Sequence, residues 1–131
     1  MLFRSTIIRC ADWFGISLIV TGEGAADPYG PKTVQSSMGS VARVQVVQTD
    51  LENYLQEWKE ATVYAAVLDG QPVGKLGKKS NGILLIGNES KGISPSLLKS
   101  VPVQKITIPR KGRAESLNAA VATGILLSHL I

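Results

Sequence analysis

"LLIGNESKGIS", residues 84–94, is an apolar run that stops abruptly at a glycine followed by an amide, an acid and a hydroxyl. Its first three residues have the composition of a buried strand, and Gly87 and Gly92 bracket the polar residues. Glycines let a backbone pass close to a ligand and present free N–H and C=O groups to it. The stretch predicts a ligand-binding loop at a strand end, or else a simple turn with solvated side chains and Ser90 as a cap.

The rest of the chain alternates short apolar strands with helices. Predicted strands lie at residues 16–21, 44–48, 62–68, 83–87 and 104–109. Predicted helices lie at residues 6–14, 32–38, 51–60, 94–99 and 116–131, with Gly15 just past the end of the first and Asp50 as the cap of the third. Residues 69–82 are rich in Gly, Pro and Lys and predict a surface loop. This order predicts an α/β fold with a mostly parallel sheet and helices on both faces, where ligands bind beyond the carboxyl ends of the strands.

Composition sets broad limits on the protein class. The 131 residues are 44% hydrophobic and 18% charged, which predicts one folded domain over residues 1–131. A net charge of +4 permits an anionic partner without requiring one. Cys10 is the only cysteine, which excludes an internal disulfide and a multi-cysteine zinc site. With no long apolar run and no signal-peptide pattern, we expect a cytoplasmic protein without a membrane span or a metal.

A second polar stretch, "IPRKGRAESLNAAVATG" (108–124), follows the last predicted strand. Ser116 is either the N-cap of the last helix or a functional hydroxyl. Asn118 is a poor residue for the first turn of a buried helix unless its amide has a partner. The helix that follows is apolar almost all round, so we expect a second subunit to cover one of its sides.

These two stretches resemble the second and third signature motifs of the SpoU/TrmH family, RNA 2′-O-ribose methyltransferases of the SPOUT superfamily. "DPYGPKTVQSSMGSVARV" is similar to the segment between the first two motifs, and "TIIRCADWFG" to the second half of the first motif. The resemblance runs from Thr6 to Ile131. It implies a C-terminal trefoil knot, S-adenosylmethionine as cofactor, tRNA or rRNA as substrate, and a homodimer packed through the last helix.

The resemblance also implies roles for particular residues. Cofactor contacts fall on backbone and apolar positions: Leu68, Gly87, Ile108, Ser116 and Leu117. Catalytic positions are Arg9, Glu89 and Asn118. Because arginine stays protonated, we expect Arg9 to orient the RNA phosphate and stabilise alkoxide charge rather than act as a base. Basic residues near the cofactor loops suit RNA phosphates: Arg110, Lys111 and Arg113, with Lys75, Lys78 and Lys79 as further candidates.

The start of the chain departs from the family pattern. An Asn-x-Gly turn usually precedes the arginine of the first motif, and the matching positions here read Phe3-Arg4-Ser5. We therefore expect an N-terminally truncated enzyme; the alternative is a non-catalytic module of this fold that binds RNA or cofactor. An unrelated nucleotide-binding α/β domain is a third interpretation. The remaining chemically notable residues are expected to serve packing: Cys10, Trp13, Trp58 and, in the core or at an interface, His129.

Overall fold

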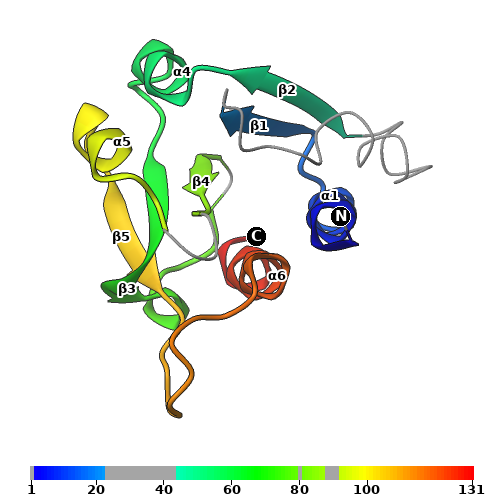
Figure 1. Cartoon of the computed structure of the whole chain (residues 1–131), viewed down its shortest axis with the longest axis vertical. Coiled ribbons are helices and arrows are strands. Elements are labelled where there is room, and N and C mark those ends of the chain that lie inside the picture. Colours follow the sequence, from blue (N-terminus) through cyan, green and yellow to red (C-terminus); the bar gives the residue numbers. More distant parts are fainter. Residues whose placement is uncertain (1, 23–43, 80, 88–91) are drawn as a thin grey trace. The chain divides into compact units, whose positions relative to one another are not determined.

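The computed structural model describes residues 2–22, 44–79, 81–87 and 92–131, with side chains from Thr6 on. The chain forms two compact units, Met1–Tyr54 and Leu55–Ile131. Figure 1 shows the helices and strands of both units, coloured along the sequence.

In residues 2–22 and 44–49, the first unit contains one helix and two parallel strands. Its elements are α1 (Leu2–Trp13), β1 (Leu18–Gly22) and β2 (Gln45–Thr49). The buried side chains of Ile8, Ala11 and Val44 form its core. Gly15 ends α1 with a φ of 77°, and the N–H of Ile16 donates to the carbonyl of Ala11. This is a Schellman motif, so the predicted helix end at Gly15 is confirmed.

Helix α4 (Leu51–Glu57) follows β2 and crosses from the first unit into the second. The carboxylate of Asp50 accepts a hydrogen bond from the N–H of Asn53 at 3.2 Å, which confirms Asp50 as its cap. The helix expected at residues 32–38 lies outside the described residues.

The second unit is a three-stranded parallel sheet with the strand order β4-β3-β5. Its elements are β3 (Val63–Pro72), the 3₁₀ turn η1 (Val73–Lys75), β4 (Ile83–Leu85), α5 (Pro95–Ser100), β5 (Gln104–Thr107) and α6 (Ala119–Leu130). Helix α6 packs Leu126 and Leu130 onto Tyr64, Val73 and Ile106. Ser94 caps α5 through the N–H of Leu97 at 3.1 Å, and Pro95 takes the first helical position, one residue after the predicted start of this helix.

The α/β class and the parallel pairing are confirmed, but the pairs form two sheets, β1-β2 and β4-β3-β5, within the described residues. Several element boundaries were predicted wrongly, among them the start of α1 at Leu2 and the end of α4 at Glu57, and two of them bear on the site. Residues 69–72 continue β3, because the chain rejoins β5 after an irregularity in the pairing. The last helix begins at Ala119 rather than Ser116, because Asn118 takes the capping position.

Candidate active site

Strand β3 carries an irregularity near its carboxyl end. Ala66 and Gln71 both lie opposite Ile106 of β5, so residues 67–70 leave the ladder between them. At Gly70 the two backbones touch, since an added Cβ would lie 2.6 Å from the backbone N and C atoms of Ile106. Only glycine fits this approach, and Leu68 and Asp69, between the two paired positions, are exposed.

The displaced residue Leu68 is fixed against the end of β5. The hydroxyl of Thr107 donates to the carbonyl of Leu68 at 3.3 Å. The Leu68 side chain is 74% exposed, whereas that of Ile108 is half-buried against the core of the unit. Two of the five expected cofactor positions, Leu68 and Ile108, therefore lie side by side.

Gly87, just after β4, marks a second close approach of backbone to backbone. An added Cβ would lie 2.5 Å from the N atom of Ile93 and 2.8 Å from the Cα of Gly92. Gly87 thus lies against the backbone of Gly92 and Ile93, and Gly92 has a φ of 67°, which favours glycine. Glu89, between the two glycines in sequence, lies outside the described residues.

The strand register brings the ends of β4 and β5 to one edge of the sheet. Leu85 pairs with Ala65, and Ile106 pairs with Ala66, the next residue of β3. Since neighbouring strands are about 5 Å apart, Gly87 and Ile108 flank the end of β3 at a separation on the order of 10 Å. Gly87 therefore joins Leu68 and Ile108 at the carboxyl edge.

Residues 109–118 form an exposed loop that leaves β5 and returns to α6 (Figure 1). One Nη of Arg110 donates to the carbonyl of Ala114 at 3.1 Å and holds the loop together. Lys111 and Arg113 are exposed in the same loop. A guanidinium has five N–H donors, so Arg110 keeps several for a phosphate.

The structure identifies the hydrogen-bond partners of Asn118, which the sequence did not predict. Its side-chain Oδ1 accepts hydrogen bonds from the N–H groups of Ala120 at 2.8 Å and Val121 at 3.3 Å. Asn118 is thus the N-cap of α6, and the interpretation of Ser116 as the cap is wrong. Ser116 and Leu117 lie in the exposed segment directly before the cap, and Leu117 is 47% exposed.

The second basic group lies at the other end of α6. Lys78 Nζ donates to the carbonyl of Ser128 at 2.6 Å, and the N–H of Lys79 donates to the carbonyl of Leu130. Ser128 is ten residues beyond Asn118, about 15 Å along a helix. Lys78 and Lys79 therefore bind the C-terminal end of α6, and their role as phosphate contacts stays a prediction.

Five further residues were singled out in the sequence. Arg9 is exposed on α1, in the first unit. The packing role predicted for the two tryptophans is wrong, since Trp13 is 84% and Trp58 54% exposed. His129 is exposed within the chain, so only its interface role stays a prediction, and Cys10 is half-buried. The functional contact of Thr107 was missed, because a threonine at a strand end is ordinary β composition.

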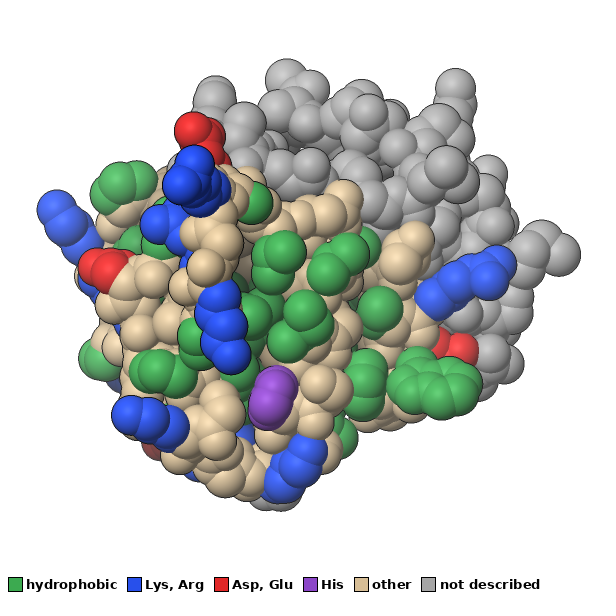
Figure 2. Space-filling view, turned by 90° about the horizontal axis from the view of Figure 1, so that it is seen from below, with side chains coloured by type: hydrophobic (Ala, Val, Ile, Leu, Met, Phe, Trp, Pro, Cys, Tyr) green, Lys and Arg blue, Asp and Glu red, His purple; other side chains and the backbone are tan. Residues whose placement is uncertain are grey.

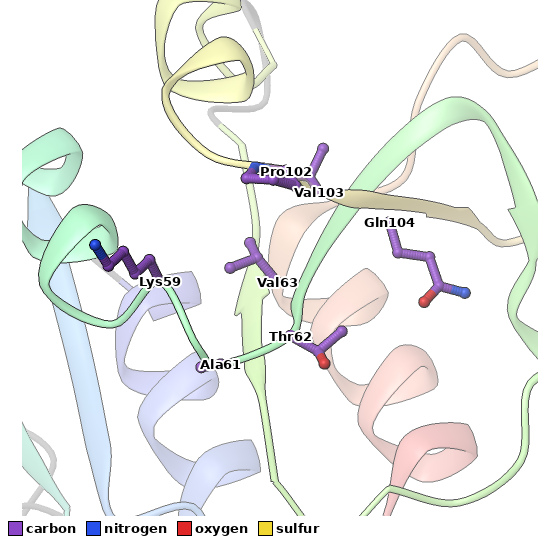
Figure 3. Close-up of a pocket in the computed structure, with 7 residues that line it drawn as sticks. All are labelled: Lys59, Ala61, Thr62, Val63, Pro102, Val103 and Gln104. Atoms are coloured by element: carbon purple, nitrogen blue, oxygen red, sulfur yellow. The ribbon is translucent and has the colours of Figure 1, made fainter.

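A separate hollow of about 300 Å³ lies at the opposite, amino edge of the sheet (Figure 3). Its walls come from the segment before β3 and from the start of β5: Lys59, Ala61, Thr62, Val63, Pro102, Val103 and Gln104. None of the predicted site residues lines it. This hollow is therefore distinct from the site at the carboxyl edge.

Within the described residues, no group of three or more His, Cys, Asp or Glu side chains could hold a metal ion. No helix in the described part of the chain has the length and apolarity to cross a membrane. The carboxyl edge offers the aliphatic side chains of Leu68 and Ile108 beside backbone groups at the strand ends. This combination fits a flat, largely apolar heterocycle whose edge is recognised by backbone hydrogen bonds.

Comparison with known proteins agrees with this chemistry. A family model described as the SpoU rRNA Methylase family matches residues 4–128. The 23S rRNA (guanosine(2553)-2′-O)-methyltransferase of Bacillus subtilis is 38% identical over 128 residues, which cover 95% of this chain and 51% of the relative. The chain thus spans about half the length of this relative.

Two solved structures are similar in fold as well as sequence. A protein from Porphyromonas gingivalis described as an RNA methyltransferase of the TrmH family superposes with a TM-score of 0.82 at 40% identity, over 97% of this chain and 53% of that one. An AdoMet-bound rRNA methyltransferase from Sinorhizobium meliloti gives 0.78 at 35% identity, over 95% and 49%. The chain therefore belongs to the SpoU rRNA methylase family.

Proposed function

We propose that the chain is the catalytic domain of an S-adenosylmethionine-dependent methyltransferase that modifies the ribose 2′-hydroxyl of RNA, with ribosomal RNA as the first candidate. The observation that carries this proposal is the meeting of Leu68, Gly87 and Ile108 at the carboxyl edge of one parallel sheet. Family membership and the rRNA methyltransferases among the similar proteins support it. The proposed compartment is the cytoplasm, where such RNA is found.

The cofactor would lie between the strand ends and the segment before α6. The residues there fit this cofactor. The side chains of Leu68, Ile108 and Leu117 would pack on the faces of its adenine ring. The backbone beside Gly87 and Ser116 would hydrogen-bond to the polar edge of the ring. When bound, S-adenosylmethionine supplies an electrophilic methyl group on a sulfonium. The Thr107 hydroxyl holds the Leu68 carbonyl in place, and the Asn118 cap fixes the start of α6 and with it Leu117.

The protein would act on the RNA chiefly by orientation. Arg9, exposed and permanently charged, grips the phosphate beside the target ribose and stabilises negative charge as the 2′-oxygen loses its proton. Glu89 would hold the site together from the loop after Gly87. The exposed cations Arg110, Lys111 and Arg113 would contact neighbouring phosphates. Alignment of the reacting groups then supplies most of the rate enhancement.

We also propose the knot and the dimer that the family resemblance implies. Lys78 and Lys79, after η1, donate hydrogen bonds to the C-terminal end of α6. These contacts support a threaded C-terminal segment. Helix α6 leaves Val121 51% exposed, and Figure 2 shows hydrophobic side chains gathered on one face beside the histidine. A second copy packed on this face would cover them.

The test is methyl transfer from labelled S-adenosylmethionine to separate samples of unmodified rRNA and tRNA. We expect transfer to rRNA and a loss of at least about a hundredfold with Arg9→Ala. Arg113→Ala is the matched control, because it removes an exposed cation from the loop and should affect RNA affinity alone. Cofactor binding without transfer to either RNA would instead favour the non-catalytic module.

A further inference from the structure

Of the large hydrophobic side chains that the structure describes, Trp13 is the most exposed, at 84%. It ends α1, whose buried side is formed by Ile8 and Ala11. A tryptophan is highly buried on average in folded proteins. The position of this ring therefore needs an explanation other than the core of its own unit.

Arg9 lies on the same side of α1 as Trp13. The two residues are four positions apart, so at 100° per residue they differ by about 40° around the helix axis and by about 6 Å along it. Ile8 and Ala11 are centred roughly 150° away on the opposite side. The guanidinium of Arg9 and the indole of Trp13 thus form one exposed stripe that has a cation at one end and an aromatic face at the other.

This pairing matches the two parts of a nucleotide. A guanidinium binds a phosphate through parallel N–H donors, and an indole face stacks on a nucleobase. The rise of about 6 Å between the two residues is comparable with the span of one nucleotide. Stacking needs an unpaired base whose face is free, whereas bases in a duplex are already stacked.

We propose that Trp13 is a stacking platform for an unpaired base next to the nucleotide that is methylated, and that it selects single-stranded RNA at the site. The inference rests on the proposed function, because it takes Arg9 as the residue that holds the adjacent phosphate. Trp13 contacts the substrate but takes no part in the transfer of the methyl group.

Fluorescence gives a readout that does not depend on activity. The chain has two tryptophans, so Trp58→Phe leaves Trp13 as the only indole, and Trp13→Phe leaves Trp58. The probe is an oligoadenosine RNA of about ten nucleotides, free or paired with oligouridine. We expect the free strand to quench Trp13 and the duplex to quench it far less, with little change at Trp58 in either case.

Kinetics with rRNA test the same contact. Trp13→Ala should raise the KM for RNA about tenfold to a hundredfold and leave the KM for S-adenosylmethionine unchanged. Trp13→Tyr should restore most of the affinity because it keeps an aromatic face. Trp58→Ala is the matched control, an exposed tryptophan outside α1, and should leave both constants unchanged.

The inference is overturned if Trp13→Ala leaves the KM for RNA unchanged, or if RNA does not quench Trp13. It is also overturned if Trp13→Ala changes the oligomeric state while RNA affinity stays the same, since the ring would then contact protein. Failure of the proposed function looks different. In that case RNA quenches Trp13 and no methyl group is transferred, so the stacking site stands and the activity does not.

Discussion

Gly87 has no side chain, and this allows its backbone to lie against the backbone of Gly92 and Ile93. An alanine there would press its Cβ against the backbone of Gly92 and Ile93, which has no flexible side chain to move aside. We expect Gly87→Ala to lower the free energy of unfolding by about 1–3 kcal/mol and to abolish binding of S-adenosylhomocysteine. Thermal unfolding and titration calorimetry measure the two effects.

Gly112→Ala is the control for this change, because nothing lies within 4 Å of a Cβ added there. Unchanged stability and cofactor binding in Gly87→Ala would show that Gly87 does not lie against the backbone of Gly92 and Ile93. The same loss in Gly112→Ala would point to a general sensitivity of the protein rather than to the contact at Gly87.

Asn118 stabilises α6 through its side-chain oxygen, so its substitutions separate capping from other roles. Asn118→Ala should cost about 1 kcal/mol of stability and weaken cofactor binding, because the start of α6 carries Leu117. Asn118→Ser keeps a capping oxygen and should retain both properties to a large extent. A serine variant that is stable, binds cofactor and transfers no methyl group would show that the amide itself acts on the substrate.

At the scale of elements, the irregularity of β3 presents the backbone of Leu68 at the carboxyl edge. The hydrogen bond from Thr107 is what fixes that carbonyl. We expect Thr107→Val to weaken S-adenosylhomocysteine binding about two- to tenfold with little loss of stability, the usual effect of one neutral hydrogen bond. Thr62→Val, at the amino edge of the sheet, is the matched control and should leave the affinity unchanged.

Sequence alone predicted the elements well where a local signal existed. Gly15 ended α1, Asp50 capped its helix, and the parallel pairing followed from strands that are apolar throughout. It failed where tertiary contacts decide. The continuation of β3 through Gly70 depends on the backbone of Ile106, which is far away in sequence.

The candidate site shows the same division. The resemblance to the family pointed to Leu68, Gly87 and Ile108, and the register of the strands brings these three together. No sequence pattern distinguished Asn118 as a cap from Ser116, since both residue types are good N-caps. The sequence also did not predict the exposure of Trp13, because tryptophan is highly buried on average in folded proteins.

At the scale of the whole molecule, a homodimer through α6 makes a separate prediction. Val121 is half exposed on α6, so Val121→Lys would place two charges within the proposed interface. We expect this variant to be monomeric in light scattering while wild type is dimeric. Lys105→Met is the control, an exposed lysine on β5, and should remain dimeric. A wild-type monomer would contradict the proposed dimer.

The account depends most on the cofactor lying at the carboxyl edge of the β4-β3-β5 sheet. A crystal structure of the protein with S-adenosylhomocysteine tests this directly. We predict density for the nucleoside between Leu68, Gly87, Ile108 and Leu117, with its adenine edge on backbone groups. Density only in the hollow beside Lys59 and Gln104, or none at a concentration that saturates binding in solution, would contradict the account.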